Sequence, residues 1–264
     1  MANFTAYHKD PRQYPFLEPV RENWQIFLEE YLEFQRTDFP HKSLFLSLLT
    51  PATDTIKSKD EGMYSVIGLF FHGYTLIDFI DKFNMTWPAI DAHDINRVLL
   101  YVRDNFFIQT QKIINSAIVA SDRLIRTVYF STFSPGLDIR LHVNRDKHEY
   151  RGYLGLSVPP GDVAMKICHE TLKWRNGEFM VLDHDYPHCP HNRTSEPRVA
   201  LIVDFLKPEF PFESMCELEN DIVMQRMKSN PYSYGIFGTD DIVSDDTFRL
   251  YGMEHQLSWK GKLS

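Results

Sequence analysis

Two histidines and two arginines in the second half of the chain have the types and spacing of a metal site that also binds an anion. They are His142, Arg151, His188 and Arg198. Each histidine precedes an apolar, alternating run that is typical of a β-strand, and an arginine accompanies each run. Neutral imidazoles bind iron, and a guanidinium binds a carboxylate through two parallel hydrogen bonds. The four residues could therefore form a non-haem iron site that uses 2-oxoglutarate as a co-substrate.

The third ligand of such a site is not obvious from the sequence. A facial triad usually begins with His-x-Asp or His-x-Glu, whereas this chain has His142-Val143-Asn144. Asn144 offers only a neutral amide oxygen, so water could hold the third position. Asp146 is the less favoured alternative, because strand geometry places its side chain at the wrong distance.

The two arginines have two possible partners. Arg198 opens the apolar run VALIVDF, where a guanidinium needs an anion to offset its desolvation. That anion is either a protein carboxylate, such as Asp204 or Asp183, or the co-substrate. Arg151 poses the same question one strand earlier. Two such arginines beside two candidate metal ligands favour the co-substrate.

A zinc site is the alternative use of the segment DHDYPHCPHNR, through His184, His188, Cys189 and His191. Structural zinc sites typically use two separated ligand pairs, whereas the prolines of this segment predict a stiff, extended loop. We therefore do not expect zinc. His184 and His191 would then line the substrate entrance or lie exposed in the loop.

Short apolar runs surround these residues and predict the fold. They are separated by the turn sequences PGLD, PPGD and RNGE, a pattern typical of an antiparallel sandwich or barrel. In the last turn, Trp174–Glu178, Gly177 is free to adopt a positive φ, and we interpret this turn as structural. The runs are IRTVYFSTF, GYLGLSV, MKICHE, EFMVLD and VALIVDF.

The chain is expected to form one domain with three regions. Residues 1–61 would be a helical region, where FLEPVRENWQIFLEEYLEF predicts an amphipathic helix. Residues 62–208 would form the β core, with a helical insertion near 94–117 that Asp94 could cap. Residues 209–264 would form a C-terminal helix and an irregular tail. The expected buried face of the first helix comprises Val20, Trp24, Phe27, Leu28 and Tyr31.

Composition excludes several functional classes. A net charge of −8 argues against a nucleic-acid partner, which requires clustered Lys and Arg. The three cysteines include no CxxC pair, so a disulfide framework is not expected. No run of about 18 apolar residues predicts a membrane span, and the start of the chain lacks the apolar middle of a signal peptide. A soluble, cytoplasmic protein is the expectation.

On these residues the chain resembles the aspartyl/asparaginyl β-hydroxylase family. The marks lie mainly between residues 127 and 208, with weaker similarity in the FLEPVRENW and GLFFHG segments. They are STFSPG at 131–136, His142 nine residues before Arg151, LGLSVP, WRNGE followed by LDHDYPH, His188 ten residues before Arg198, and VDF followed by Pro208.

The resemblance implies a mainly β fold with flanking helices, a double-stranded β-helix of the jelly-roll or cupin-like kind. It also implies Fe(II), 2-oxoglutarate and O2 as cofactor and co-substrates. By position, His142 and His188 resemble the iron ligands and Arg198 resembles the anchor for the distal carboxylate of 2-oxoglutarate. Ser131 resembles the hydroxyl that assists this arginine, and Arg151 a second arginine that orients co-substrate or substrate.

The expected function is hydroxylation of an unactivated carbon in an amino-acid, peptidyl or carrier-bound substrate, with succinate and carbon dioxide as co-products. Candidate substrate contacts are Asn144, Tyr153, His184 and His191, where Tyr153 replaces a histidine of some members. One alternative is a non-catalytic protein that binds a small acid. The other is a related oxygenase that acts on a lipid, or one that halogenates, desaturates or cyclises its substrate.

Overall fold

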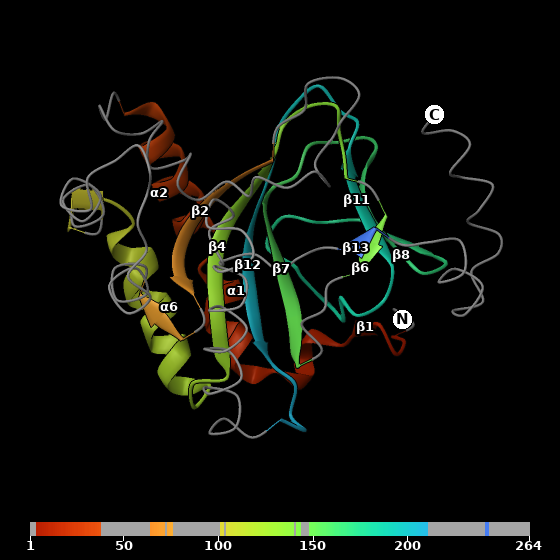
Figure 1. The fold of residues 1–264 in the computed structure, drawn as a ribbon. Coiled ribbons are helices and arrows are strands. Elements are labelled where there is room, and N and C mark those ends of the chain that lie inside the picture. Colours follow the sequence, from red (N-terminus) through yellow and green to blue (C-terminus); the bar gives the residue numbers. More distant parts are fainter. Residues whose placement is uncertain are drawn as a thin grey trace, which may run out of the picture.

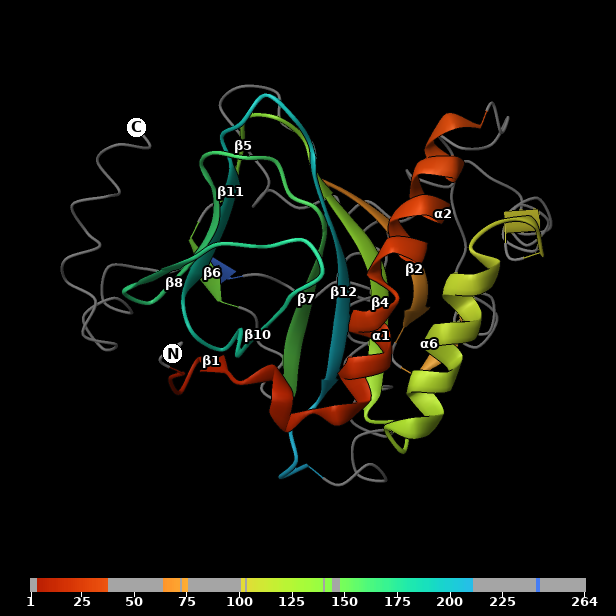
Figure 2. The ribbon, with the colours of Figure 1, turned by 180° about the vertical axis from the view of Figure 1, so that it is seen from behind.

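Two antiparallel β-sheets face each other, and helices cover the outer face of the larger sheet (Figure 1, Figure 2). The computed structural model describes residues 4–37, 64–71, 73–75, 101–102, 104–139, 141–143, 148–210 and 241–242. The architecture is the predicted mainly β fold with flanking helices, of the double-stranded β-helix class.

The larger sheet has seven strands in the order β1-β10-β7-β12-β4-β2-β3. Its central strands correspond to the apolar runs of the sequence. The first strand comes from the N-terminal region, outside the predicted core. The strands are β1 (His8–Lys9), β10 (Phe179–Leu182), β7 (Glu149–Ser157), β12 (Arg198–Leu206), β4 (Ile125–Phe133), β2 (Tyr64–Phe71) and β3 (Tyr74–Thr75).

The smaller sheet has six strands, with β13-β6-β11-β8-β9 in order and β5 also paired to β11. These are β13 (Asp241–Ile242), β6 (His142–Val143), β11 (His188–Asn192), β8 (Val163–Ile167), β9 (Glu170–Leu172) and β5 (Leu137–Asp138). The expected loop around His188 is therefore a β-strand. Pro190 is tolerated in it because proline loses only its N–H, and its carbonyl still accepts from the backbone N of Ile139 at 3.0 Å.

The N-terminal helices form where the amphipathic pattern predicted them. The short 3-10 turns η1 (Pro11–Gln13) and η2 (Pro15–Leu17) lead into α1 (Glu18–Glu22), and Asn23 separates α1 from α2 (Trp24–Arg36). In α2 the buried residues Phe27, Tyr31 and Phe34 share the predicted face. The Tyr31 hydroxyl lies 2.7 Å from Oγ1 of Thr132, which ties α2 to β4.

The predicted helix near 94–117 is interrupted. Residues 101–102 and 104–105 are helical, but Phe107 has a φ of 57° and a new helix, α6 (Ile108–Ala120), begins after it. Phe107 is buried, with its ring centroid 5.1 Å from that of Phe34 and 5.2 Å from that of Phe130. Both carboxylate oxygens of Glu30 accept backbone N–H groups in the first turn of α6, at 2.8 Å each. Burial of the Phe107 ring and the cap from Glu30 stabilise this interrupted arrangement in place of the predicted continuous helix.

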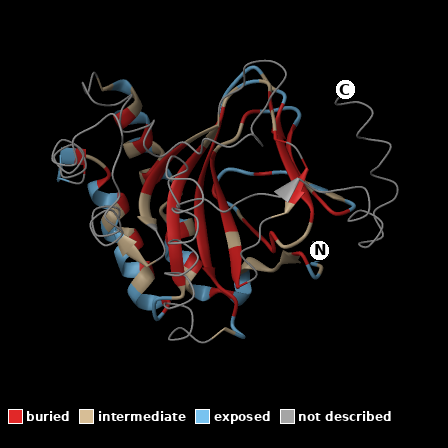
Figure 3. Cartoon of the chain, in the orientation of Figure 1, coloured by how far each residue is buried: buried red, intermediate tan, exposed pale blue. Residues whose placement is uncertain are grey.

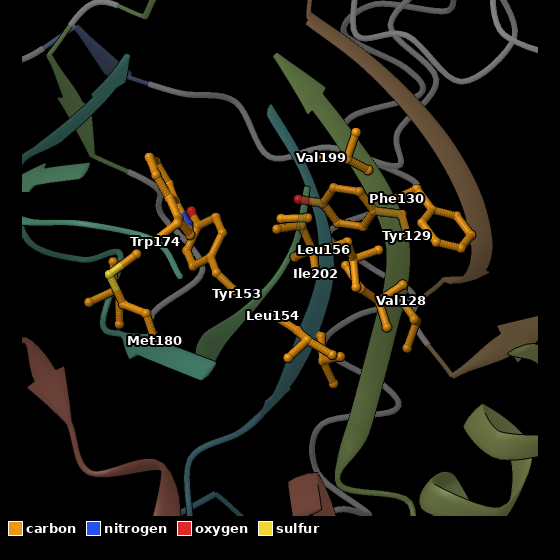
Figure 4. Close-up of a cluster of buried hydrophobic side chains, with 14 of the residues drawn as sticks. Val128, Tyr129, Phe130, Tyr153, Leu154, Leu156, Trp174, Met180, Val199 and Ile202 are labelled. Atoms are coloured by element: carbon orange, nitrogen blue, oxygen red, sulfur yellow. The ribbon is translucent and has the colours of Figure 1, made fainter. Parts of the chain in front are cut away.

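The central strands of the larger sheet are buried over most of their length (Figure 3). Their side chains form two layers, one on each face of the sheet. Phe130 faces the helices, where it contacts Tyr31 at a ring distance of 5.4 Å. Tyr153 and Trp174 extend to the other side, toward the smaller sheet (Figure 4). The space between the two sheets is therefore lined by polar and aromatic side chains.

None of the helices in the described part of the chain has the length and apolar character needed to cross a membrane. The predicted C-terminal helix and tail, apart from β13, lie outside the described residues, as do Asn144 and Asp146.

Candidate active site

His142 and His188 lie directly opposite each other on neighbouring strands. They form the register pair of β6 and β11, and directly paired residues of an antiparallel ladder project from the same face. Their ring centroids are 4.2 Å apart at an interplanar angle of 57°. Both side chains are buried, and His188 is only 1% exposed. The two predicted metal ligands are thus brought together by strand pairing.

The backbone fixes the orientation of His188. Its Nδ1 lies 2.8 Å from the carbonyl oxygen of Tyr186, so Nδ1–H donates and the Nε2 lone pair remains available. Burial, followed by the nearby His142, lowers the pKa of His188 well below its usual value. At neutral pH this imidazole is uncharged, which is the form that binds a metal.

A third imidazole, His184, stacks against this pair. Its ring centroid is 4.0 Å from that of His188, and its Nε2 lies 2.8 Å from the Tyr153 hydroxyl. Nη1 of Arg151 approaches its Nδ1 at 3.5 Å. His184 is buried, so it is not an exposed loop residue, and burial lowers its pKa well below the usual value. Tyr153 and His184 thus belong to the same buried cluster as the histidine pair.

His191 lies apart from this cluster. Three positions along β11 from His188, it projects to the opposite face, because side chains alternate along a strand. Its Nε2 lies 2.8 Å from Oδ1 of Asp162. Within the described residues, no recorded contact links His191 to His142 or His188, so its position does not support the predicted role in substrate binding.

The arrangement also disfavours the zinc alternative. Cys189 follows His188 immediately and therefore projects to the opposite face of β11. Burial raises the pKa of its thiol to about 12, the behaviour of a cysteine that packs in the protein interior. Among the residues that the structure describes, no group of three or more His, Cys, Asp or Glu side chains is arranged to hold a metal ion. In that part of the chain the histidine pair is thus a candidate ligand set of two residues.

Strand register places the two candidate arginines on the inner face of the larger sheet. Arg151 is opposite Asp204, and Ser131 is opposite Ala200, two positions from Arg198. Residues two apart on a strand share a face, so Arg151 shares the face of Tyr153. Histidines from one sheet and arginines from the other therefore line the same interior.

Arg151 has a protein carboxylate as its partner. Its Nε and Nη2 each donate to one oxygen of Asp204 at 2.7 Å, a bidentate ion pair. This is the alternative that the sequence left open, and it holds for Arg151. The pKa of Arg151 is raised well above its usual value by this carboxylate, against the opposing effect of burial. Its charge is compensated before any co-substrate arrives.

Among the residues that the structure describes, Arg198 has no such carboxylate. Asp204 is taken by Arg151, and Asp183 binds the Lys207 ammonium at 2.9 Å. Arg198 is fully buried, and its Nη1 donates to the carbonyl oxygen and the hydroxyl of Ser131, both at 3.2 Å. Within the described residues its Nε and Nη2 have no hydrogen-bond partner. Neither of the two carboxylates considered from the sequence therefore pairs with Arg198.

Two aromatic rings hold the Arg198 guanidinium in place. Its Cζ lies 3.6 Å from the ring centroid of Phe133 and 4.6 Å from that of Trp174. Burial lowers the pKa of Arg198 to about 10, because desolvation disfavours the charged form. Nε and Nη2 form one edge of the planar guanidinium, the fork that matches a carboxylate. This edge is the candidate anion site.

The loop between β10 and β11 has supports that the sequence did not reveal. Lys207 donates to Asp183 and Asp185, both at 2.9 Å, on either side of His184. The backbone N of Asp183 also donates to the carbonyl oxygen of Tyr7. A lysine directly after the apolar end of a buried strand was an available signal. The role of a backbone carbonyl, such as that of Tyr186, cannot be predicted from the residue types in the sequence.

Comparison with known proteins gives one family match. Residues 21–208 match the sequence model of the aspartyl/asparaginyl beta-hydroxylase family. A curated relative, the ornithine lipid ester-linked acyl 2-hydroxylase of Rhizobium tropici, is 36% identical over 86 residues. That match covers 32% of this chain and 31% of the relative, so the chain spans less than a third of the relative's length.

Solved structures show weaker similarity. A conserved protein with a double-stranded beta-helix domain from Klebsiella pneumoniae has a TM-score of 0.26 and 18% identity, covering 32% of this chain and 70% of that protein. A non-heme monooxygenase, ThoJ in complex with nickel, has a TM-score of 0.29 and 14% identity, covering 37% and 51%. The fold assignment rests on the strand order of the chain itself.

Proposed function

Because the chain belongs to the aspartyl/asparaginyl beta-hydroxylase family, we propose that it is an iron(II)- and 2-oxoglutarate-dependent hydroxylase. In this proposal His142 and His188 hold the iron. Arg198, assisted by Ser131, binds the distal carboxylate of 2-oxoglutarate.

The buried fork of Arg198 is the observation that carries the proposal. A buried charge without a counter-ion is costly, and proteins retain one where a ligand supplies the opposite charge. The two unpaired nitrogens of Arg198 are the two that a carboxylate binds together. Two neighbouring aromatic rings keep this edge in a defined plane. A small dicarboxylate matches the site in charge and shape.

The histidine pair fits a metal. Both imidazoles project from one face of the smaller sheet, and the Tyr186 carbonyl selects the His188 tautomer whose Nε2 can bind. Two protein nitrogens would leave the other positions on the metal to 2-oxoglutarate, oxygen and water. When bound, iron and 2-oxoglutarate supply the oxidising chemistry that hydroxylates an unactivated carbon, with succinate and carbon dioxide as co-products.

The residues of the chain orient the reactants and limit the access of water. The Arg151–Asp204 pair holds Arg151 against His184, and His184 in turn bonds Tyr153. This network stacks on His188 and restricts its ring. Rigid support of this kind keeps reacting groups within the tolerance that catalysis needs.

Two substrate classes remain as proposals. The sequence favours an amino-acid, peptidyl or carrier-bound substrate. The Rhizobium relative is named for hydroxylation of an ester-linked acyl chain, which favours a lipid acyl chain as the second candidate.

Succinate release tests the proposed function. The purified protein would be incubated with iron(II), 2-oxoglutarate and air, together with acyl lipids in one series and aspartyl or asparaginyl peptides in another. We expect succinate and a product heavier by one oxygen atom in one series, with His188→Ala as the inactive control. Binding of 2-oxoglutarate without succinate in either series would favour the non-catalytic alternative. A product mass other than one added oxygen would indicate halogenation, desaturation or ring closure.

A further inference from the structure

The indole N–H of Trp174 is a second donor without a partner beside Arg198. Trp174 is only 4% exposed, and within the described residues its Nε1 has no hydrogen-bond partner. An indole N–H can donate but cannot accept, so it requires an acceptor. Buried donors of this kind are rare in folded proteins and call for a specific explanation.

Trp174 lies at the anion site defined by Arg198. The indole ring centroid is 4.6 Å from the Arg198 Cζ, and the ring also contacts Phe133 at a centroid distance of 6.3 Å. On its other side it meets Tyr153 edge-on at 6.0 Å, next to which it lies in Figure 4. The partnerless indole nitrogen and the partnerless guanidinium edge therefore belong to two side chains in direct contact, and each requires an acceptor at about 2.9 Å.

The turn that carries Trp174 is locked against β7. The Gly155 backbone N donates to Glu178 and its carbonyl accepts from Gly177. A Cβ on Gly155 would stand 2.2 Å from the carbonyl oxygen of Arg175, so only glycine allows this approach. Gly177 has a φ of 73°, as the sequence predicted. The turn is structural, and its structure fixes the position of Trp174.

We propose that Trp174 donates its indole N–H to the same carboxylate that Arg198 binds. This inference rests on the proposed function and adds a binding residue to it. Arg198 contributes Nε and Nη2, Trp174 contributes Nε1, and all three are donors only. Such a site selects an acceptor-only carboxylate and rejects a carboxamide, whose NH2 group would face a donor. The site should therefore bind 2-oxoglutarate much more tightly than its distal amide, 2-oxoglutaramate.

Calorimetric titration tests the proposal without turnover. Zinc(II) would replace iron(II), and 2-oxoglutarate would be titrated into the parent, Trp174→Phe and Trp24→Phe. Phenylalanine keeps an aromatic ring over Arg198 but removes the N–H. Trp24 is the matched control, because its indole packs on Gly177 from outside the anion site. A hydrogen bond to a charged group contributes about 1.5 to 3 kcal/mol, so we expect roughly ten- to hundredfold weaker binding for Trp174→Phe.

The outcomes separate this inference from the proposed function. If Trp174→Phe binds 2-oxoglutarate within about twofold of the parent, the inference is wrong and the role of Arg198 stands. If the parent itself binds no 2-oxoglutarate, both are overturned. Equal weakening in Trp24→Phe would mean that the turn moved, and it would also count against a direct bond.

The parent protein offers a second measurement that does not depend on a folded variant. The chain has four tryptophans, so nitrogen-labelled protein gives few indole N–H signals in an NMR spectrum. With zinc(II) bound, addition of 2-oxoglutarate should move the Trp174 proton signal downfield, as expected for a hydrogen bond to a carboxylate. The signal is assigned by its absence in Trp174→Phe, or by specific labelling if that variant does not fold. An unmoved signal at saturating 2-oxoglutarate would overturn the proposal.

Discussion

Replacing Arg198 by methionine should stabilise the ligand-free protein while removing its affinity for 2-oxoglutarate. If Arg198 served packing alone, its replacement should instead destabilise the protein, because most substitutions of buried residues are destabilising. The prediction follows from the position of the guanidinium, which is fully buried and has two nitrogens without partners in the described residues. Methionine matches the length of the side chain and carries no charge.

The magnitude follows from the pKa. Burial lowers the pKa of Arg198 from its ordinary value of 12.5 to about 10, and one pKa unit corresponds to about 1.4 kcal/mol, so keeping the charge costs roughly 3 kcal/mol. Because the folded pKa lies below the unfolded one, this cost is fully present at neutral pH and declines only above about pH 10. The pKa shift already contains the part of the contacts with Ser131 and the rings that depends on the charge, so their loss is counted at the strength of two ordinary hydrogen bonds, about 1 to 2 kcal/mol. We expect a net stabilisation of about 1 to 2 kcal/mol.

Urea unfolding of metal-free protein measures the stability, and calorimetric titration of 2-oxoglutarate into zinc(II)-loaded protein measures the affinity. Arg198→Lys is the matched control: it keeps the charge but lacks the fork, so it should lose affinity without gaining stability. A destabilisation of about 2 kcal/mol or more in Arg198→Met would refute the reasoning, because it would mean that the charge has a partner in the folded protein.

Three further predictions concern the histidine cluster and its support. His188→Ala should abolish succinate formation with the far-ultraviolet circular dichroism unchanged, and full 2-oxoglutarate consumption would exclude His188 as a ligand. Lys207→Met leaves Asp183 and Asp185 without their shared cation, so zinc(II) affinity measured by calorimetry should fall about tenfold, whereas Lys207→Arg should retain it. Burial lowers the pKa of His184 and His188, so as the pH falls the unfolded chain binds protons at these histidines before the folded protein does. The free energy of unfolding of metal-free protein should therefore decrease as pH falls below about 6.5, by up to about 1.4 kcal/mol per pH unit for each histidine, and His184→Gln should show a smaller slope. Equal slopes in urea unfolding would contradict this assignment.

Apolar periodicity was sufficient to predict most strands of the larger sheet. The runs around Leu154 and Leu201 are buried on both faces, so their sequences are almost continuously apolar and easily recognised. The segment at His188 was harder, because its prolines and polar residues resemble a loop although its backbone is paired on both sides. The interruption at Phe107 depends on aromatic contacts with distant residues, which local helical periodicity does not contain.

The candidate site was predictable in its residue types but not in its pairings. The spacing of His142, His188 and Arg198 indicated the candidate metal pair and the candidate anion site, and the structure places the two histidines side by side. It did not indicate which arginine Asp204 would neutralise, since that depends on the register of β7 against β12. Trp174 was interpreted only as part of a turn, because the lack of a partner for its N–H becomes apparent only in three dimensions.

The shortness of β6 has a consequence for the cooperativity of the molecule. Within the described residues this strand comprises His142 and Val143. It lies between β11 and β13, so His142 is aligned with His188 on one side and with Ile242 on the other. Three sequence-distant segments thus meet in one ladder. Any ligand that bridges the two imidazoles holds β6 to β11 and suppresses the local opening of β6. Because such coupling is reciprocal, the pairing of β13 with β6 must increase the affinity for that ligand by the same factor. Amide hydrogens of β6, β11 and β13 should therefore gain protection from hydrogen exchange together when a ligand is bound. Part of the binding free energy would then stabilise the pairing of residues 241–242, which are distant in sequence.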